Sequence, residues 1–192
     1  MRFSTSTGQR RTADSGFTLI EVLISMFILT IGMLSLLGVF GLSMSATMTA
    51  QEDRIAKQLA QDAFESIYTA RDTNNIPWPS IENVSGGGSG IFVTGLQPIK
   101  QAGADAIVGT ADDAAAPAQV FTLPGPDGIV GTADDVTVSL TNFKRQIVIT
   151  DVLSGGGTVA DLKNVSVTIQ YTTPQAALAK QYVLAGYISQ YR

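Results

Sequence analysis

A long uncharged apolar stretch with one carboxylate at its start is the feature that most constrains this chain. No residue from Val22 to Gln51 carries a charge, and Glu21 directly precedes the stretch. At ~1.5 Å of rise per residue, a helix over these positions would be roughly 45 Å long, more than the ~30 Å of a bilayer core. The stretch therefore predicts a membrane-spanning helix. An acid at its edge is costly in lipid, so Glu21 is expected to have a functional partner.

The polar segment before this stretch has the charge of a cytoplasmic leader. It carries Arg2, Arg10 and Arg11 against Asp14, and such positive flanks stay on the cytoplasmic side of a membrane. An ordinary secretory signal is cut after its apolar core, whereas here the small residue Gly16 precedes the core. Cleavage at this glycine would leave the apolar core on the mature chain. The sequence thus predicts a leader over residues 1–16.

The run Gly-Phe-Thr-Leu-Ile-Glu at residues 16–21, followed by an uninterrupted apolar helix, resembles the signature of type IV prepilins and type II secretion pseudopilins. The resemblance implies that a prepilin peptidase of the inner membrane cuts between Gly16 and Phe17 and methylates the new amino terminus on Phe17. Residues 17–33 look closest to minor pilins of the pilus modification type and to minor pseudopilins. The alternative is a signal-anchor helix that is never cut.

The expected role of Glu21 follows from charge. A new amino group on Phe17 would stay largely protonated at neutral pH, and burying it in a helical filament is costly unless an opposite charge meets it. The resemblance implies that Glu21 of one subunit pairs with the amino terminus of its neighbour and sets the axial step of assembly. The alternative is that Glu21 pairs with its own amino terminus, one helical turn away.

Composition excludes several chemistries. The chain has no cysteine and no histidine, which removes disulfides, thiolate metal sites, histidine metal ligation and histidine-activated nucleophiles. Its formal net charge of −4 becomes more negative without the leader and argues against nonspecific nucleic-acid binding. No pair of nucleophile and base stands out. We therefore predict no catalytic residue and no enzymatic activity.

The helix is expected to continue past the membrane. The apolar residues Ile55, Leu59, Phe64 and Ile67 recur near helical spacing, and charged or amide side chains fill the other faces. This pattern predicts one helix from about residue 17 to 71. Residues 17–48 would span the membrane or form the filament core, and residues 49–72 would form an amphipathic extension.

Residues 73–192 are predicted to form a globular, β-rich head. A connector at 74–90 holds the only tryptophan, Trp78, between Pro77 and Pro79. The prolines are expected to end the helix, and Trp78 is expected to be a packing anchor rather than a binding site.

Strand-like segments follow the connector, and the last three show the strongest alternation. They are residues 90–96, 119–123, 135–140, 145–152, 164–171 and 181–189, with connections expected at 150–162 and 173–180. A long helix followed by a mostly antiparallel sheet is an α+β fold, and it is also the pilin layout.

The head contains a duplication. Residues 103–113 recur as 125–135, with nine of eleven positions identical. Each copy supplies three carboxylates in a glycine-containing loop, which suits calcium better than a transition metal. The candidate ligands are Asp105, Asp112 and Asp113 in the first copy and Asp127, Asp134 and Asp135 in the second. The unit resembles Asp-rich calcium loops of secreted bacterial proteins, although it is not an EF-hand.

The alternative for the duplication is two ordinary solvated turns. The second copy is expected to be the better calcium candidate because Gly128 replaces Ala106 and Pro126 pre-sets the turn, whereas the first copy runs into 114–116, three alanines, in weaker surroundings. The sequence is compatible with two arrangements of calcium, one ion held between both loops or one ion in each loop.

Taken together, these features predict a subunit, of the minor class, of a type IV pilus or pseudopilus. Its expected partners are the prepilin peptidase, other pilin or pseudopilin subunits, the inner-membrane assembly platform and the membrane itself. We expect a single-pass inner-membrane protein with a cytoplasmic N-terminus before assembly, and a pilus or periplasmic pseudopilus afterwards. The alternative function is a membrane-anchored extracytoplasmic module for calcium-dependent binding or adhesion.

Overall fold

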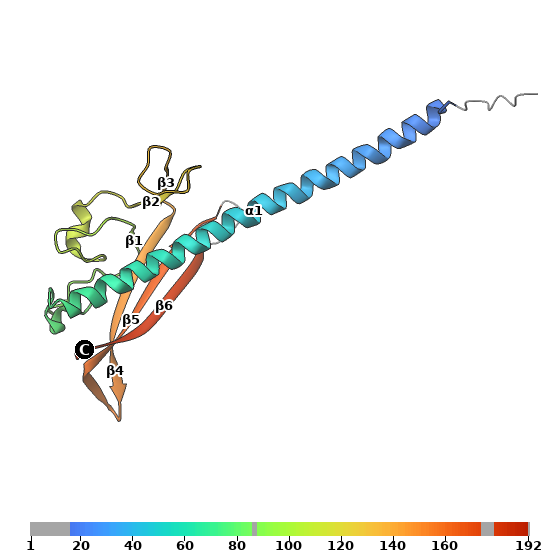
Figure 1. Cartoon of the computed structure of the whole chain (residues 1–192). Helices are drawn as coiled ribbons and strands as arrows, with labels where there is room; N and C mark the ends of the chain where they lie inside the picture. The colour runs from blue at the N-terminus through green and yellow to red at the C-terminus, as the bar shows by residue number, and fades with distance from the viewer. Residues whose placement is uncertain (1–15, 86–87, 174–178, 192) are drawn as a thin grey trace, which may run out of the picture. The chain divides into compact units, whose positions relative to one another are not determined.

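The computed structural model describes residues 16–85, 88–173 and 179–191 (Figure 1). The chain divides into two compact units, Met1–Met44 and Ser45–Arg192. The helix α1, Leu19–Asp72, contributes residues to both units. The class is α+β and pilin-like, as the sequence predicts, with one long N-terminal helix followed by an antiparallel sheet.

The second half of α1 buries one narrow face in the head. Ile55, Leu59 and Ile67 are nearly inaccessible to solvent, as the helical spacing predicts. Phe64 is partly buried and packs against the same core. The buried stripe also holds small residues that the pattern of large residues does not reveal, namely Ala56, Ala60, Ala63 and Ala70. These alanines allow a close approach of the helix to the sheet that it crosses in Figure 1.

The C-terminus of α1 is closed by an asparagine. Asn74 has φ 54°, in the left-handed region that asparagine tolerates better than most residues. Its N–H donates to the carbonyl of Arg71, and the N–H of Asn75 donates to the carbonyl of Ala70. This is the Schellman pattern of hydrogen bonds. The expectation that the prolines end the helix was therefore wrong, because the chain turns before it reaches Pro77.

The main sheet has four antiparallel strands in the order β1-β4-β5-β6. The strands are β1 (Gln97–Pro98), β4 (Phe143–Ser154), β5 (Gly157–Tyr171) and β6 (Lys180–Ser189). Alternate side chains of β4 and β5, including Ile147, Val167 and Ile169, point into the core. The predicted segments 145–152, 164–171 and 181–189 are confirmed as strands.

Two strand predictions need correction. Residues 90–96 form no strand, because Phe92 makes only isolated bridges and the paired residues follow at Gln97–Pro98. The predicted connection at 150–162 is a tight hairpin instead, with strands running up to Ser154 and on from Gly157. Consecutive glycines at 155 and 156, both with positive φ, allow this short turn. Part of the predicted connection at 173–180 lies outside the described residues.

A separate hairpin of β2 (Val120–Leu123) and β3 (Val136–Ser139) carries the second copy of the duplicated segment as its loop. The first copy lies between β1 and β2 and ends in the short 3-10 helix η2, Ala111–Ala115. Both predicted strands of this hairpin are confirmed within a residue or two.

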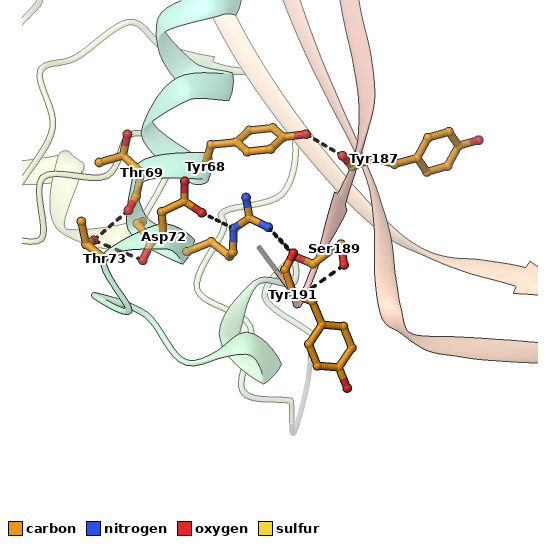
Figure 2. Close-up of polar contacts among 9 residues, drawn as sticks. Tyr68, Thr69, Asp72, Thr73, Tyr187, Ser189 and Tyr191 are labelled. Carbon is orange, nitrogen blue, oxygen red and sulfur yellow. Dashed lines mark hydrogen bonds and ion pairs between the residues drawn. The ribbon is translucent and has the colours of Figure 1, made fainter.

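Side chains bond backbone groups on β6 and on the part of β4 that extends beyond the two-residue strand β1. On β6, the carbonyl of Tyr187 accepts a hydrogen bond from the hydroxyl of Tyr68, and the carbonyl of Ser189 accepts one from the guanidinium of Arg71 (Figure 2). On β4, the amide of Asn83 donates to the carbonyl of Ile147 at 2.8 Å and accepts from the N–H of Ile149 at 2.7 Å. These groups replace the missing neighbouring strands.

Trp78 begins the 3-10 helix η1, Trp78–Ser80, and packs against the core. Its indole N–H donates to the carbonyl of Ala160 at 2.8 Å. Ala160 lies in an irregular part of the β4–β5 pairing, where the register shifts between Asp151 and Val152 and leaves residues 160–162 without partners on β4. The structure thus places Trp78 as a packing anchor, as expected.

The two duplicated segments share a turn that needs a left-handed residue. Gly128 has φ 73°, and the equivalent Ala106 has φ 58° although its Cβ makes this conformation unfavourable. A second shared requirement lies at Gly103 and Gly125, where an added Cβ would come within 2.4 Å of the carboxylate of Asp112 or Asp134, respectively. The first copy therefore holds backbone strain that the second copy avoids.

We predict that Ala106→Gly stabilises the head by about 1 kcal/mol, because the left-handed strain exceeds the extra entropy that glycine gains in the unfolded chain. Ala104→Gly is the matched control and should be neutral or destabilising, since Ala104 does not have a positive φ. Urea unfolding of the purified chain in detergent, followed by fluorescence of the only tryptophan, measures both. An equal loss of stability in the two variants would contradict the inference that Ala106 is strained.

Candidate functional site

The predicted processing segment lies just before the first turn of α1. Gly16, Phe17 and Thr18 are not helical, and α1 begins at Leu19. Phe17 is 84% exposed, and a side chain added at Gly16 would contact nothing within 4 Å. The described part of the chain therefore contains no packing reason for a glycine here. A requirement for glycine at this position has to come from another molecule.

Thr18 caps the helix beside the predicted assembly residue. The carbonyl of Thr18 accepts hydrogen bonds from the N–H groups of Glu21 and Val22, and its hydroxyl is 3.4 Å from the N–H of Glu21. A threonine followed three residues later by glutamate is the capping-box sequence, and here only its threonine half is formed, by the Thr18 hydroxyl and the Glu21 N–H. The carboxylate of Glu21 makes no hydrogen bond or ion pair with another described residue. The sequence analysis missed this role of Thr18, although the Thr-x-x-Glu spacing signals it.

The helix behind Glu21 is suited to an apolar environment. It contains an 18-residue window with mean hydropathy 2.5, none of it buried in the structure. Its few hydroxyl groups turn back onto the helix, as Ser25 donates to the carbonyl of Glu21 and Thr30 donates to that of Met26. By length and composition this segment is able to cross a membrane. Glu21 is the only charged side chain in its path before Glu52.

The duplicated loops use their carboxylates in the same way. In each copy the first aspartate accepts from the N–H two residues later, the second bonds a threonine hydroxyl, and the third accepts from a glycine N–H four residues earlier. The first-copy pairs are Asp105 with Ile107, Asp112 with Thr110, and Asp113 with Gly109. The second-copy pairs are Asp127 with Ile129, Asp134 with Thr132, and Asp135 with Gly131. These three side-chain hydrogen bonds are thus repeated in the two copies.

Hydrogen bonding and burial shift the pKa values of several loop carboxylates. The threonine hydroxyl is the main cause that holds the pKa of Asp112 below its usual value, and the same contact from Thr132 lowers the pKa of Asp134. Burial has the opposite effect on Asp113, whose pKa is raised although two backbone N–H groups and Arg145 partly compensate. The carboxylates therefore close their own loops by accepting from nearby donors.

The surroundings of the two copies differ from the expectation. Ile107 of the first copy is 1% exposed and part of the core, whereas its counterpart Ile129 is 61% exposed. Asp113 is buried near Arg145, while its counterpart Asp135 is half-buried. The prediction that the first copy has the weaker surroundings was wrong, because the core of the head encloses its apolar residues.

The structure brings the three aspartates of each copy into one loop, but within the described ranges it groups no three acidic side chains in an arrangement suited to a metal ion. One oxygen is distinctive. Oδ1 of Asp135 is buried and finds no hydrogen-bond partner among the described residues. Its first-copy equivalent, on Asp113, accepts from the N–H of Gly103 at 2.8 Å. Calcium binding by these loops stays a prediction.

Comparison with known proteins identifies the N-terminal segment. Residues 11–37 match the family model of the prokaryotic N-terminal methylation motif. No curated protein and no solved structure matches the chain. The match covers Gly16, Phe17, Thr18 and Glu21 together with the first turns of α1, and it leaves the head unassigned.

The motif implies processing by a prepilin peptidase and assembly with other pilins, and it indicates a structural subunit rather than an enzyme. Together with the apolar helix it fits a protein that is anchored in a membrane before assembly. The chain thus carries the N-terminal signal of type IV prepilins and pseudopilins.

Proposed function

We propose that this chain is a minor subunit of a type IV pilus or pseudopilus, which enters the filament through its N-terminal helix. The observation that carries the proposal is the position of Glu21. It is the lone acid of an exposed apolar helix, four residues after the first residue of the expected mature chain, inside the methylation motif. The likeness of residues 17–33 to minor pilins supports the minor class.

The chemistry of assembly follows from exposure. Large apolar side chains such as Phe27, Leu37 and Phe40 are 65–69% exposed, so this surface needs lipid first and other helices later. Transfer from lipid to a helical bundle changes the free energy of these apolar side chains little, because both surroundings are apolar. The free energy of Glu21 changes much more, because Glu21 gains a cationic amino terminus as its partner. We propose that this ion pair selects the docking position of each subunit.

The first prediction concerns processing. Mass spectrometry of the protein from cells should find a mature chain that starts at methylated Phe17. Gly16→Leu should leave the leader attached and the protein in the inner membrane, without a change in the stability of the head, because Gly16 contacts nothing within 4 Å. Gly32→Leu is the matched control, since it too adds a leucine where the structure leaves space. A mature chain that still begins at Met1 would refute the proposed processing.

The second prediction separates the two roles of Glu21. Glu21→Gln keeps a capping-box residue but removes the charge, and Glu21→Ala removes both. If the charge directs docking, both variants should be cleaved normally yet appear in sheared surface filaments, or in an induced pseudopilus, at roughly a tenth of the normal level or less. Normal incorporation of Glu21→Gln together with poor incorporation of Glu21→Ala would assign Glu21 to helix capping instead.

A calcium-dependent role of the head is the second candidate function. The observation that favours it is Oδ1 of Asp135, a buried carboxylate oxygen with no hydrogen-bond donor among the described residues. An unpaired buried oxygen is costly, and a hard cation would satisfy it while neutralising the three acids of the loop. We propose the second copy as the first place to test.

The third prediction concerns calcium. Full-length protein in detergent should melt several degrees higher in millimolar calcium than in chelator, if the loop binds in the extracellular range. Asp134→Asn combined with Asp135→Asn should abolish the difference, whereas Asp112→Asn combined with Asp113→Asn tests the first copy. Equal melting temperatures for the unaltered protein with and without calcium would identify both loops as ordinary turns.

A further inference from the structure

A buried arginine in the head faces a cavity. Arg145 lies on β4, and its side chain is only 5% exposed. It lines a cavity of about 220 Å³ between the β1–β4 edge and the first duplicated segment. The cavity wall is mostly apolar, with Val93, Pro98 and Ile147, and it also holds the polar side chains of Gln97 and Lys100.

The guanidinium of Arg145 has unused hydrogen-bonding capacity. It donates no hydrogen bond to any residue within 16–85, 88–173 or 179–191. Its nearest counter-charge is Asp113, whose Oδ2 lies 3.9 Å from Nη2, beyond hydrogen-bonding distance. Asp113 instead accepts from the N–H groups of Gly103 and Gly109. The five donors of this guanidinium have no acceptor among the described residues, so an acceptor inside the cavity that Arg145 lines would be favourable.

The charges around the cavity favour an anion. Arg145 and Lys100 line it together with one acid, Asp113, which leaves a net positive wall. Lys100 donates to the backbone carbonyl of Ala114, which holds its ammonium at the rim. Asp62 on α1 adds a more distant negative charge that partly offsets Arg145. Burial lowers the pKa of Arg145 but leaves it cationic at neutral pH.

The volume of the cavity and the composition of its wall indicate which class of anion would fit. The volume is below that of typical sites for drug-sized ligands and equals the space of only several water molecules. A planar carboxylate matches the fork of guanidinium donors, and a short apolar body matches the walls. We propose that this cavity binds a carboxylate group on a short apolar body, with Arg145 as its main ligand.

The test uses full-length protein in detergent with ¹⁵N-labelled arginine. The Nε–H signal of Arg145, assigned by its loss in Arg145→Gln, should shift saturably on titration with sodium propionate, with a Kd on the order of millimolar. Propionamide has the same shape without the charge and should cause no such shift. Sodium chloride at equal ionic strength controls for screening.

Matched variants locate the site. Ala114→Leu adds volume to the cavity wall and keeps Arg145, so it should weaken propionate binding at least roughly tenfold, while Ala118→Leu, at an exposed residue that does not line the cavity, should not. Lys100→Gln should weaken binding by a smaller factor. Because Ala114→Leu does not depend on the folding of an arginine variant, the proposal stays testable if Arg145→Gln unfolds.

A second set of titrations distinguishes two sources of the carboxylate by comparing the affinities of two ligands. Tighter binding of propionate than of a glutamate residue blocked at both ends would indicate a free short-chain acid, and the reverse order would indicate an acidic side chain of another protein. Either order supports a carboxylate site. The absence of a saturable shift, or equal shifts with propionate, propionamide and chloride, would overturn the proposal.

Discussion

The head depends on the burial of one narrow stripe of α1 against the sheet. Ile55, Leu59 and Ile67 provide the large contacts, each contributing about 2 kcal/mol relative to an exposed position. The buried alanines between them bring the helix close enough to meet the inward-facing residues of β4 and β5. Without this contact the sheet would expose an entire apolar face, so every other feature of the head follows from it.

Polar contacts from α1 and the connector also attach these segments to the sheet, in addition to the apolar stripe. Asp53 accepts hydrogen bonds from the hydroxyl of Tyr171 and the ammonium of Lys180, and these donors hold its pKa below the usual value. Tyr68 and Arg71 reach the carbonyls of β6 (Figure 2). Asn83 bonds the backbone of β4 beyond the two residues that pair with β1. A sheet with open edges can pair with other chains. Here the described side-chain contacts occupy several of the backbone groups that such pairing would use.

The duplicated loops show how tertiary context separates two nearly identical sequences. Most side-chain hydrogen bonds recur in both loops, because they depend only on residues a few positions apart. Their environments differ, because the first copy carries its isoleucine into the core and the second carries its isoleucine at the tip of the β2–β3 hairpin. The strained Ala106 is retained where packing holds the turn, and the exposed copy has Gly128 in the same conformation.

Much of this protein was predictable because its signals are local. The local pattern around residues 16–21 identified the methylation motif, and periodicity identified the amphipathic extension and the three long strands. The leader and the role of Glu21 in assembly stay predictions. These features depend on neighbours within a few turns, so a single sequence contains them. The clear alternation of β4 and β5 reflects the buried face of the sheet, whereas residues 90–96 make only isolated bridges.

Other features depended on residues distant in the chain. The closure of α1 by Asn74, the contacts of Asn83 with β4 and the position of Arg145 over a cavity each require groups from separate segments to meet. A sequence pattern does not record which polar group meets which edge. The sequence by itself therefore determined the N-terminal methylation motif and the long apolar helix. Only the tertiary structure decided which loop is buried and which arginine faces a cavity, because these depend on how the sheet and helix enclose space.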